Sequence, residues 1–325
     1  MSKSLATKPP LTTNVVILNG MARSGKKLSC RILSNLERVE FFQYTSVVEN
    51  LCYLYGLGMI GAENAAALLR AHVDEAVYNY AIGRCLNTRV ADESCIYNAP
   101  ELELYIRRSA APSGAAAVAS LNEAGRIALI DTHSTLAWAG LLFDAMPYLR
   151  LVHVTRHPVD IAEDWLRRGW GGRYGVDPIA FNLVVAASDG TLVPWFAADW
   201  ADEYAAMTEC ERCVESVVRL QAEEQAAYAA LPPERKERVF RYAFEHMLAE
   251  PHHVIDELCR FLGVEPRDTL PGLLATEGCP AGIPASARQA NYRVLARESS
   301  PAVLERLSRA ATAYERVWQI PVPTK

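Results

Sequence analysis

The feature that most constrains this chain lies near its start, where an apolar strand pattern, a glycine loop and a helical pattern follow one another. Residues 14–19 read Asn-Val-Val-Ile-Leu-Asn. A short, β-branched and continuously apolar run of this kind is typical of a central parallel strand that is buried on both faces. The run ends at Gly20, and apolar residues recur at helical spacing from Leu28 onward. The chain therefore begins with the strand and first helix of an α/β fold.

The alternation of strand and helix patterns continues along the chain. Strand patterns recur at 127–130, 149–155 and 239–242, and helical patterns lie at 47–57, 65–80, 138–145, 202–230, 251–262 and 301–318. Strands that alternate with helices predict a central parallel sheet with helices on both faces. We therefore expect an α/β fold with a helical elaboration.

A single domain is the simplest organisation for these 325 residues. Residues 1–13 contain two lysines and two prolines but lack the apolar stretch of a secretory signal, so we expect a flexible tail. Residues 14–325 then form one domain. Within it, the glycine- and aromatic-rich segment 169–200 is expected to be a loop-dominated insertion, which suits a substrate lid. No pattern indicates an oligomeric state.

Composition excludes several classes of protein. The 33 Lys and Arg against 38 Asp and Glu leave a formal net charge of −5, which argues against a nucleic-acid binder. No window approaches the roughly 20 apolar residues that a membrane crossing needs. The eight cysteines are dispersed along a long chain and are expected to be reduced thiols. These observations favour a cytoplasmic protein with neither a nucleic-acid partner nor a transmembrane segment.

Residues 20–26 fit the pattern G-x-x-x-x-G-K between a predicted strand and a predicted helix. Backbone N–H groups of such a loop close around a phosphate, and the helix N-terminus adds its positive end. A plain strand-to-helix turn is the alternative. Lys27 stands where a nucleotide triphosphatase has the Ser or Thr that holds magnesium. A metal-independent anionic ligand therefore fits better than ATP or GTP.

Three separated blocks carry a resemblance to a known family. They are Arg23-Ser24-Gly25 at the helix start, residues 149–160 (Leu-Arg-Leu-Val-His-Val-Thr-Arg-His-Pro-Val-Asp), and residues 244–251 (Phe-Glu-His-Met-Leu-Ala-Glu-Pro) followed by Phe261-Leu262-Gly263. In this order they resemble the donor-binding signatures of the sulfotransferases that use 3′-phosphoadenylyl sulfate (PAPS). The resemblance implies sulfuryl transfer from PAPS to a hydroxyl or amine of a small-molecule, carbohydrate or lipid acceptor, with PAP as the product nucleotide and no metal required.

The resemblance also implies a set of donor-binding residues. In the family the first loop wraps the 5′-phosphosulfate of the donor; the corresponding residues here are Arg23, Ser24, Gly25, Lys26, Lys27 and Leu28. Arg156 matches the arginine that holds the 3′-phosphate, and its planar fork of donors suits that role. Asp164 stands where relatives have a Ser, and Phe244 where an aromatic lies near the adenine. Alternatively, Arg156 pairs with Asp160 or Glu163, and Phe244 belongs to the core.

Asp131-Thr132-His133 ends the second strand pattern, at the sheet edge where ligands collect in parallel α/β folds. It resembles the Lys-Thr-His of relatives, whose His removes the proton of the acceptor hydroxyl. An imidazole suits this task because its pKa lies near neutrality. The alternative is a His that caps or packs at the following helix. Lys26 is the second candidate catalytic residue, because a cation there stabilises charge on the departing phosphate.

Three departures from the family pattern involve four residues. Lys26 and Lys27 replace hydroxyl residues, Asp131 replaces a Lys, and Asp164 replaces a Ser. Two explanations are open. Lys26 or Lys27 supplies the positive charge that the replaced lysine would have given, and one version of this explanation pairs it with Asp131. Alternatively, the phosphate-bearing donor is not PAPS. The departures leave two alternatives to the sulfotransferase: a P-loop kinase-like phosphotransferase, and a non-catalytic sulfotransferase-like binding protein.

The remaining candidate groups favour structural roles. Cys210 and Cys213 have zinc-type spacing without a second pair, and no cluster completes a site at His252-His253, so we expect no metal site. A solvated face is expected for the late arginines, Arg288, Arg293 and Arg297. The aromatic residues that flank the insertion fit either packing or an acceptor pocket; they are Trp165, Trp170, Tyr174, Trp195, Phe196 and Trp200.

Overall fold

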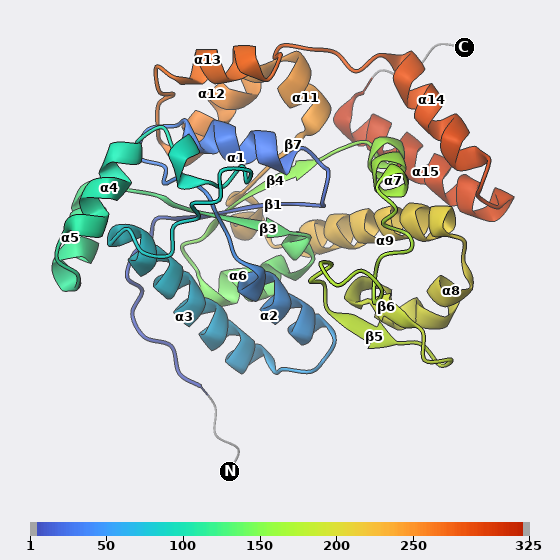
Figure 1. The fold of residues 1–325 in the computed structure, drawn as a ribbon, viewed down its shortest axis with the longest axis horizontal. Coiled ribbons are helices and arrows are strands. Elements are labelled where there is room, and N and C mark those ends of the chain that lie inside the picture. The colour runs from blue at the N-terminus through green and yellow to red at the C-terminus, as the bar shows by residue number, and fades with distance from the viewer. Residues whose placement is uncertain (1–4, 321–325) are drawn as a thin grey trace.

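The computed structural model describes residues 5–320, at whose centre lies a five-stranded sheet (Figure 1). All of its strand pairs are parallel, and the strand order is β2–β3–β1–β4–β7. This confirms the predicted α/β fold with a central parallel sheet. The strands are β1 (Val15–Gly20), β2 (Gln43–Tyr44), β3 (Ala128–His133), β4 (Arg150–Thr155) and β7 (Val239–Ala243).

The helices fall along the chain largely where the sequence patterns predict them. They are α1 (Lys26–Ser34), α2 (Ser46–Gly56), α3 (Ala62–Ala81), α4 (Leu102–Ala110), α5 (Ala115–Glu123), α6 (Ala139–Ala145), α7 (Pro158–Arg167), α8 (Ala201–Ala206), α9 (Glu209–Ala230), α10 (Pro233–Lys236), α11 (Phe244–Ala249), α12 (Pro251–Leu262), α13 (Leu270–Thr276), α14 (Ala285–Ala296) and α15 (Pro301–Trp318). Shorter 3-10 turns cover Ile96–Asn98, Thr135–Trp138 and Trp195–Trp200.

Helices cover both faces of the sheet, and β1 shows how the sequence achieves this. Its side chains alternate in direction. Val15 and Ile17 pack in one apolar cluster with residues of α2, α3, α6 and α9, whereas Val16 and Leu18 pack in a second cluster with α1, α12 and α13. Figure 1 shows α1 and α11–α13 on one side of the strands, with α2, α3 and α6 on the other. An uninterrupted apolar strand is thus buried on both faces.

Local sequence explains where several helices end, and it corrects one prediction. Gly263 ends α12 in the left-handed conformation (φ 68°), as its position after the apolar pattern predicts. The predicted single helix over 202–230 is wrong, because Met207 and Thr208 are extended and separate α8 from α9. The Thr208 side chain accepts a hydrogen bond from the Glu211 N–H, which starts α9 with a capping box.

Segment 169–200 contains more regular structure than a loop. Two short strands, β5 (Val184–Ala186) and β6 (Leu192–Pro194), form an antiparallel hairpin, and the turn Trp195–Trp200 follows.

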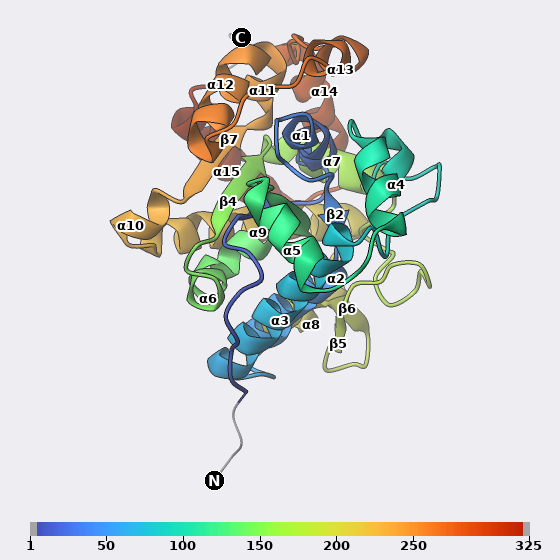
Figure 2. The same cartoon turned by 90° about the vertical axis from the view of Figure 1, so that its left-hand side faces the viewer.

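At the other end of the domain, residues 5–12 run along α3 and α5 (Figure 2). The Leu11 N–H donates to Asp74 (3.1 Å), and the Leu11 carbonyl accepts from Asn122 (2.8 Å). Residues 1–4 of the predicted tail lie outside the described part. None of the helices within residues 5–320 is long and apolar enough to cross a membrane.

The sheet register brings the predicted site segments to one edge. Gly20 at the end of β1 pairs with His133 at the end of β3, and Asn19 pairs with His153 of β4. β4 ends at Thr155, which pairs with Ala243 of β7. The glycine loop, His133, Arg156 and Phe244 therefore all follow carboxyl ends of parallel strands, the edge where such sheets bind ligands.

Candidate functional site

The loop between β1 and α1 requires glycine at its two ends. Gly25 has φ 96°, and a side chain there would collide with the Phe244 ring, while a Cβ at Gly20 would lie 2.5 Å from the Val154 carbonyl oxygen. Arg23 is also left-handed, at φ 74°. The loop delivers the chain into the N-terminus of α1, whose first N–H groups have no partner within the helix. This arrangement concentrates backbone donors at the carboxyl edge of the sheet.

The two lysines of the loop have different surroundings. The Lys26 side chain is buried, and its Nζ donates to Asp131 Oδ1 and to the Thr132 carbonyl oxygen, both at 2.6 Å. Lys27 Nζ lies 3.2 Å from Glu93, and its side chain is 63% exposed. Lys26 therefore neutralises the carboxylate of Asp131, whereas the Lys27 side chain lies at the surface.

Asp164 on α7 is surrounded by arginines at the rim of the loop. Its Oδ2 accepts from Arg23 Nε at 2.6 Å, and its Oδ1 accepts from Arg167 Nη2 at 2.7 Å and from Arg168 Nε at 3.0 Å. Burial alone would raise the pKa of Asp164, but the Arg23 and Arg168 guanidinium groups hold that pKa below its usual value. Asp164 is thus an ionised carboxylate that forms an ion pair with Arg23.

Arg156 follows β4 and lies against the loop. Its Nη1 donates to the Arg23 carbonyl oxygen at 3.1 Å, and its guanidinium stacks over Phe244 at 5.3 Å from the ring centre. The alternative pairing with Asp160 is not what the structure shows, because Asp160 accepts hydrogen bonds from Arg288 and Asn291. Arg156 and Phe244 therefore form one surface beside the loop, and Phe244 both packs in the core cluster and contacts the loop.

Arg288 corrects the expectation of a solvated face. It is 7% exposed, and its guanidinium lies 3.0 Å from Asp160 and 3.2 Å from Glu245. Glu245 in turn accepts the His157 N–H at 3.0 Å. This buried cluster connects α14 to the residue next to Arg156, so it positions the candidate site without lining it.

Two side-chain donors beside the loop are buried and have no hydrogen-bond partner among residues 5–320. They are the Ser24 hydroxyl and Arg156 Nε. Buried polar atoms are nearly always paired, so these two donors at one loop still have hydrogen-bonding capacity for a ligand. A hydroxyl and a guanidinium N–H both suit the oxygens of an anion. The chemistry of the donor set therefore fits a phosphate-bearing ligand.

His133 is held by a carboxylate that the sequence analysis missed. Glu49 Oε1 lies 2.8 Å from His133 Nδ1 and also accepts the His133 backbone N–H at 2.6 Å, while the Tyr53 hydroxyl donates to the His133 carbonyl oxygen at 2.8 Å. With its Nδ1 proton donated to Glu49, the imidazole carries its free lone pair on Nε2. The side chain is 34% exposed and lines a cavity. His133 is thus oriented as a proton acceptor.

The cavity beside His133 has a volume of about 190 Å³ and aromatic walls. The Tyr53 and Trp195 rings stack with centres 3.7 Å apart, and Trp165 Nε1 donates to the Ala22 carbonyl oxygen of the glycine loop at 3.0 Å. Segment 169–200 contributes much of the wall. Its residues at the cavity are Trp170, Arg173, Tyr174, Asn182, Trp195 and Phe196. The aromatic residues near the insertion thus pack together and also enclose the space in front of His133.

Glu49 is 6% exposed, and a sequence signal for it exists. It stands on the same helix as Val48, Leu51 and Cys52, all of which are buried. A lone carboxylate among buried residues of an amphipathic helix requires a partner, because an unpaired buried charge is costly. The sequence does not indicate that this partner lies 84 residues away.

No family model matches the sequence, and no curated protein does so. Among solved structures, the chain is similar to a sulfotransferase domain from the curacin biosynthetic pathway (11% identity, TM-score 0.48) and to one from the olefin synthase of Synechococcus PCC 7002 (14% identity, TM-score 0.47). These matches cover 98% and 99% of this chain and all of the other chain. A sulfotransferase from Alicyclobacillus acidocaldarius is 14% identical over 96% of this chain and all of its own, with a TM-score of 0.38. All three are sulfotransferases, the family that the three sequence blocks resemble, and the likeness concerns the fold alone.

Proposed function

We propose that the chain is a sulfotransferase that transfers a sulfuryl group from PAPS to a hydroxyl or amine of a small, flat, apolar acceptor. One observation carries the proposal: a glycine loop adjoins a cavity that His133, bonded to Glu49, faces, and two buried donors of the loop region have no hydrogen-bond partner among residues 5–320. The loop suits an anionic donor, and the aromatic cavity suits an acceptor. Both lie at the carboxyl edge of one parallel sheet.

The donor-binding roles follow from placement around the loop. The N–H groups at the start of α1 and the Ser24 hydroxyl bind the 5′-phosphosulfate, while Arg156 binds the 3′-phosphate and Phe244 packs beside the nucleotide. Gly25 gives the loop its close approach, and Leu28 packs in the core behind it. Lys26 acts through Asp131, whose negative charge it cancels so that the carboxylate does not oppose charge on the departing phosphate. Lys27 contributes its backbone N–H alone.

The chemical step needs one base. His133 Nε2 takes the proton of the acceptor hydroxyl as the acceptor oxygen forms a bond to sulfur and the bond from sulfur to the nucleotide oxygen breaks. PAP leaves with the bonding electron pair. The Glu49 carboxylate stabilises the imidazolium that forms, because Nδ1–H continues to donate to it. The aromatic walls hold the acceptor and exclude water. PAPS is a co-substrate, and no step requires a metal.

The cavity narrows the acceptor class. With a volume of about 190 Å³ and six surrounding aromatic side chains from Tyr53 to Phe196, it fits a small planar molecule better than a carbohydrate or a lipid chain. The eight cysteines are free thiols, which suits a reducing compartment, and we place the reaction in the cytoplasm.

A kinase-like phosphotransferase has less support. Lys26 is held by Asp131 and the Thr132 carbonyl, and position 27 offers an exposed lysine instead of a magnesium-binding hydroxyl. One observation favours a non-catalytic binding protein: the Arg23 side chain is already paired with Asp164. The presence of an oriented base at a cavity favours the enzyme.

A transfer assay distinguishes the three functions. The protein is incubated in EDTA with PAPS carrying a labelled sulfate and a panel of small phenols and aromatic amines, and in parallel with magnesium ATP and the same acceptors. The sulfotransferase forms labelled sulfate esters or sulfamates and releases PAP. Phosphorylated acceptor in the magnesium arm would instead establish the kinase. A protein that binds PAP but forms neither product over the whole panel would be the non-catalytic relative.

A further inference from the structure

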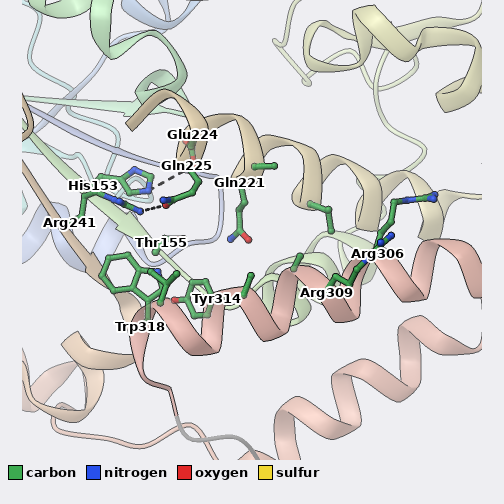
Figure 3. A pocket seen from close by; sticks show the side chains of 15 residues that line it. His153, Thr155, Gln221, Glu224, Gln225, Arg241, Arg306, Arg309, Tyr314 and Trp318 are labelled. Atoms are coloured by element: carbon green, nitrogen blue, oxygen red, sulfur yellow. Dashed lines mark hydrogen bonds and ion pairs between the residues drawn. The ribbon is translucent and has the colours of Figure 1, made fainter. Parts of the chain in front are cut away.

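A second cavity, larger than that beside His133, lies between α9 and α15. Its volume is about 360 Å³, within the range of roughly 300–1,000 Å³ typical of small-molecule sites. Figure 3 shows the lining side chains, which extend from Arg306 and Arg309 of α15 at one end to Trp318 of α15 and Arg241 of β7 at the other. We call it the α9–α15 groove. Leu220 lines the His133 cavity and Gln221 lines the groove, so α9 separates the two spaces.

Small side chains on the facing helices create the groove. Val218 and Ala222 are four residues apart on α9, and Ala310 and Ala313 are three apart on α15, so each pair lies on one helix face. Larger apolar side chains at these positions would fill the space between the helices and pack them closely. The alanines leave instead an elongated slot with apolar walls.

Arg241 places a positive charge at the end of the groove near the sheet, and among residues 5–320 this charge has no ion-pair partner. Arg241 Nη2 donates to the Gln225 side-chain oxygen at 2.6 Å, and the guanidinium lies 4.0 Å from the ring centre of Tyr228 and 5.4 Å from that of Trp318. All three partners are neutral. Among residues 5–320 Arg241 has no ion pair, and its Nε is buried without a hydrogen-bond partner. A half-buried guanidinium in such surroundings favours an anion.

Glu224 and His153 also line this end of the groove, and both are largely uncharged at neutral pH. Burial raises the pKa of Glu224 to about 8, which leaves it mostly protonated at pH 7. Burial and, to a lesser extent, the charge of Arg241 lower the pKa of His153 to about 3. At the other end Arg306 is paired with Glu215 at 2.6 Å, and Arg309 lies 3.8 Å from Glu305. Among the described residues, Arg241 is therefore the arginine of the groove that has no ion pair.

We propose that the α9–α15 groove binds an anionic amphiphile, a molecule with an unbranched apolar chain and a single carboxylate or sulfate head. The head pairs with Arg241 beside Trp318, and the chain lies along the slot between Ala222 and Ala313. The apolar walls supply binding free energy through the area removed from water, and the guanidinium selects the sign of the head. The site is distinct from the candidate active site and does not depend on its function.

Calorimetry with three ligands of equal chain length tests the proposal. Dodecanoate, dodecanol and dodecyltrimethylammonium are titrated separately into the full chain below their critical micelle concentrations. Dodecanoate is expected to bind at one site, about tenfold or more tighter than dodecanol, because only the carboxylate can form a charge-assisted hydrogen bond with Arg241. The cation is expected not to bind. Absence of dodecanoate binding, or equal affinity for the anion and the cation, overturns the proposal.

Two matched pairs of variants locate the site. Ala313→Trp fills the slot and is expected to abolish dodecanoate binding, whereas Thr312→Trp, on an exposed neighbouring position of α15, is expected to leave it unchanged. Arg241→Gln is expected to reduce dodecanoate affinity to that of dodecanol, whereas the exposed Arg238→Gln is not. Circular dichroism checks that each variant is folded. Unchanged binding in a folded Ala313→Trp variant places the ligand elsewhere and refutes the assignment.

Discussion

Two histidines on the strands that flank β1 each lie beside a glutamate, yet the two pairs differ in burial. His133 bonds Glu49 through Nδ1 at 2.8 Å, and its side chain is 34% exposed. His153 lies 3.9 Å from Glu224 and is 3% exposed. Burial lowers the pKa of His153 to about 3 and raises that of Glu224 to about 8, so at neutral pH this second pair is largely uncharged.

The surroundings of the two pairs explain the difference. His133 faces a cavity in which water or an acceptor can contact its imidazole, while Asn19 closes off His153 by donating to its Nδ1 at 2.8 Å. A histidine that cannot become charged cannot take a proton in a reaction. Both imidazoles lie beside a cavity and a carboxylate, so neither feature alone distinguishes them. Exposure of the side chain, 34% for His133 against 3% for His153, distinguishes the candidate base from the structural histidine.

The largest effect is expected at His133. His133→Ala removes the base, and we expect the rate of sulfuryl transfer to fall by roughly 10²–10⁴-fold. PAP affinity should stay at the wild-type value, since the hydrogen bond that the His133 ring makes goes to Glu49 and not to the glycine loop. His252→Ala, at an exposed position of α12, is the matched control and should transfer normally. Full transfer by a His133→Ala protein that binds PAP would show that another group takes the proton.

The second prediction concerns the stability of the buried pair. Because the folded-state pKa of Glu224 is raised, the folded protein holds a proton that the unfolded chain releases between about pH 4.5 and 8. Stability contributed by the protonated carboxyl is therefore lost as pH rises through this window, at up to about 1.4 kcal/mol per pH unit. Glu224→Gln cannot ionise, so its free energy of unfolding should exceed that of the wild type increasingly from pH 5 to pH 8. Urea unfolding of both proteins at each pH measures the difference; a difference independent of pH would mean that Glu224 is already ionised at pH 5.

A smaller effect is expected at Glu49. Glu49→Gln keeps the shape but loses the charge that stabilises the His133 imidazolium, so transfer should fall by roughly 10–100-fold, as is typical for loss of a group that orients a catalytic residue. Glu63→Gln, at an exposed position of α3, is the matched control. Initial rates of transfer at saturating PAPS provide the measurement. Equal rates of transfer for the two variants would show that Glu49 does not assist the proton transfer to His133.

The smallest effect is expected at Asp164, a carboxylate that opposes the anionic donor where Glu49 assists the base. Asp164→Ser frees Arg23, Arg167 and Arg168 and removes one negative charge beside the loop. PAP should then bind about tenfold tighter, the equivalent of ~1.4 kcal/mol. Calorimetry at two salt concentrations checks the result, since screening should reduce the gain. Weaker PAP binding by this variant would mean that Asp164 holds Arg23 in the position that the donor needs.

Much of the fold was predictable because its signals are local. Local sequence determines the conformation of the apolar run of β1, of the loop start at Gly20 and of the helix end at Gly263. The break between α8 and α9 was missed because both helices continue one apolar pattern, although Thr208 and Glu211 have the spacing of a capping box. The sheet order and the convergence of the loop with His133 follow from parallel connections.

The charge pairs of the site were harder to predict, because their partners are distant in the sequence. Lys26 and Asp131 are 105 residues apart, and Arg23 and Asp164 are 141 apart. The sequence permitted a pair between Lys26 and Asp131 but also a role for Lys27, whose side chain lies at the surface. Ion pairs of this kind depend on which side chains the fold brings together, and no local pattern encodes that.

The most direct test of the account is the titration of PAP into the wild-type protein in EDTA, repeated with Arg156→Ala and with Arg167→Ala as the matched control. The account predicts that PAP binds at one site with micromolar affinity and that magnesium does not change this affinity. Arg156→Ala should weaken PAP binding roughly tenfold or more, because charge-assisted hydrogen bonds are removed. Arg167→Ala should change the affinity little, because most of the Arg167 side chain is exposed. No binding of PAP in EDTA, or binding of ATP alone and only with magnesium, would contradict the claim that the glycine loop and Arg156 form a PAPS site.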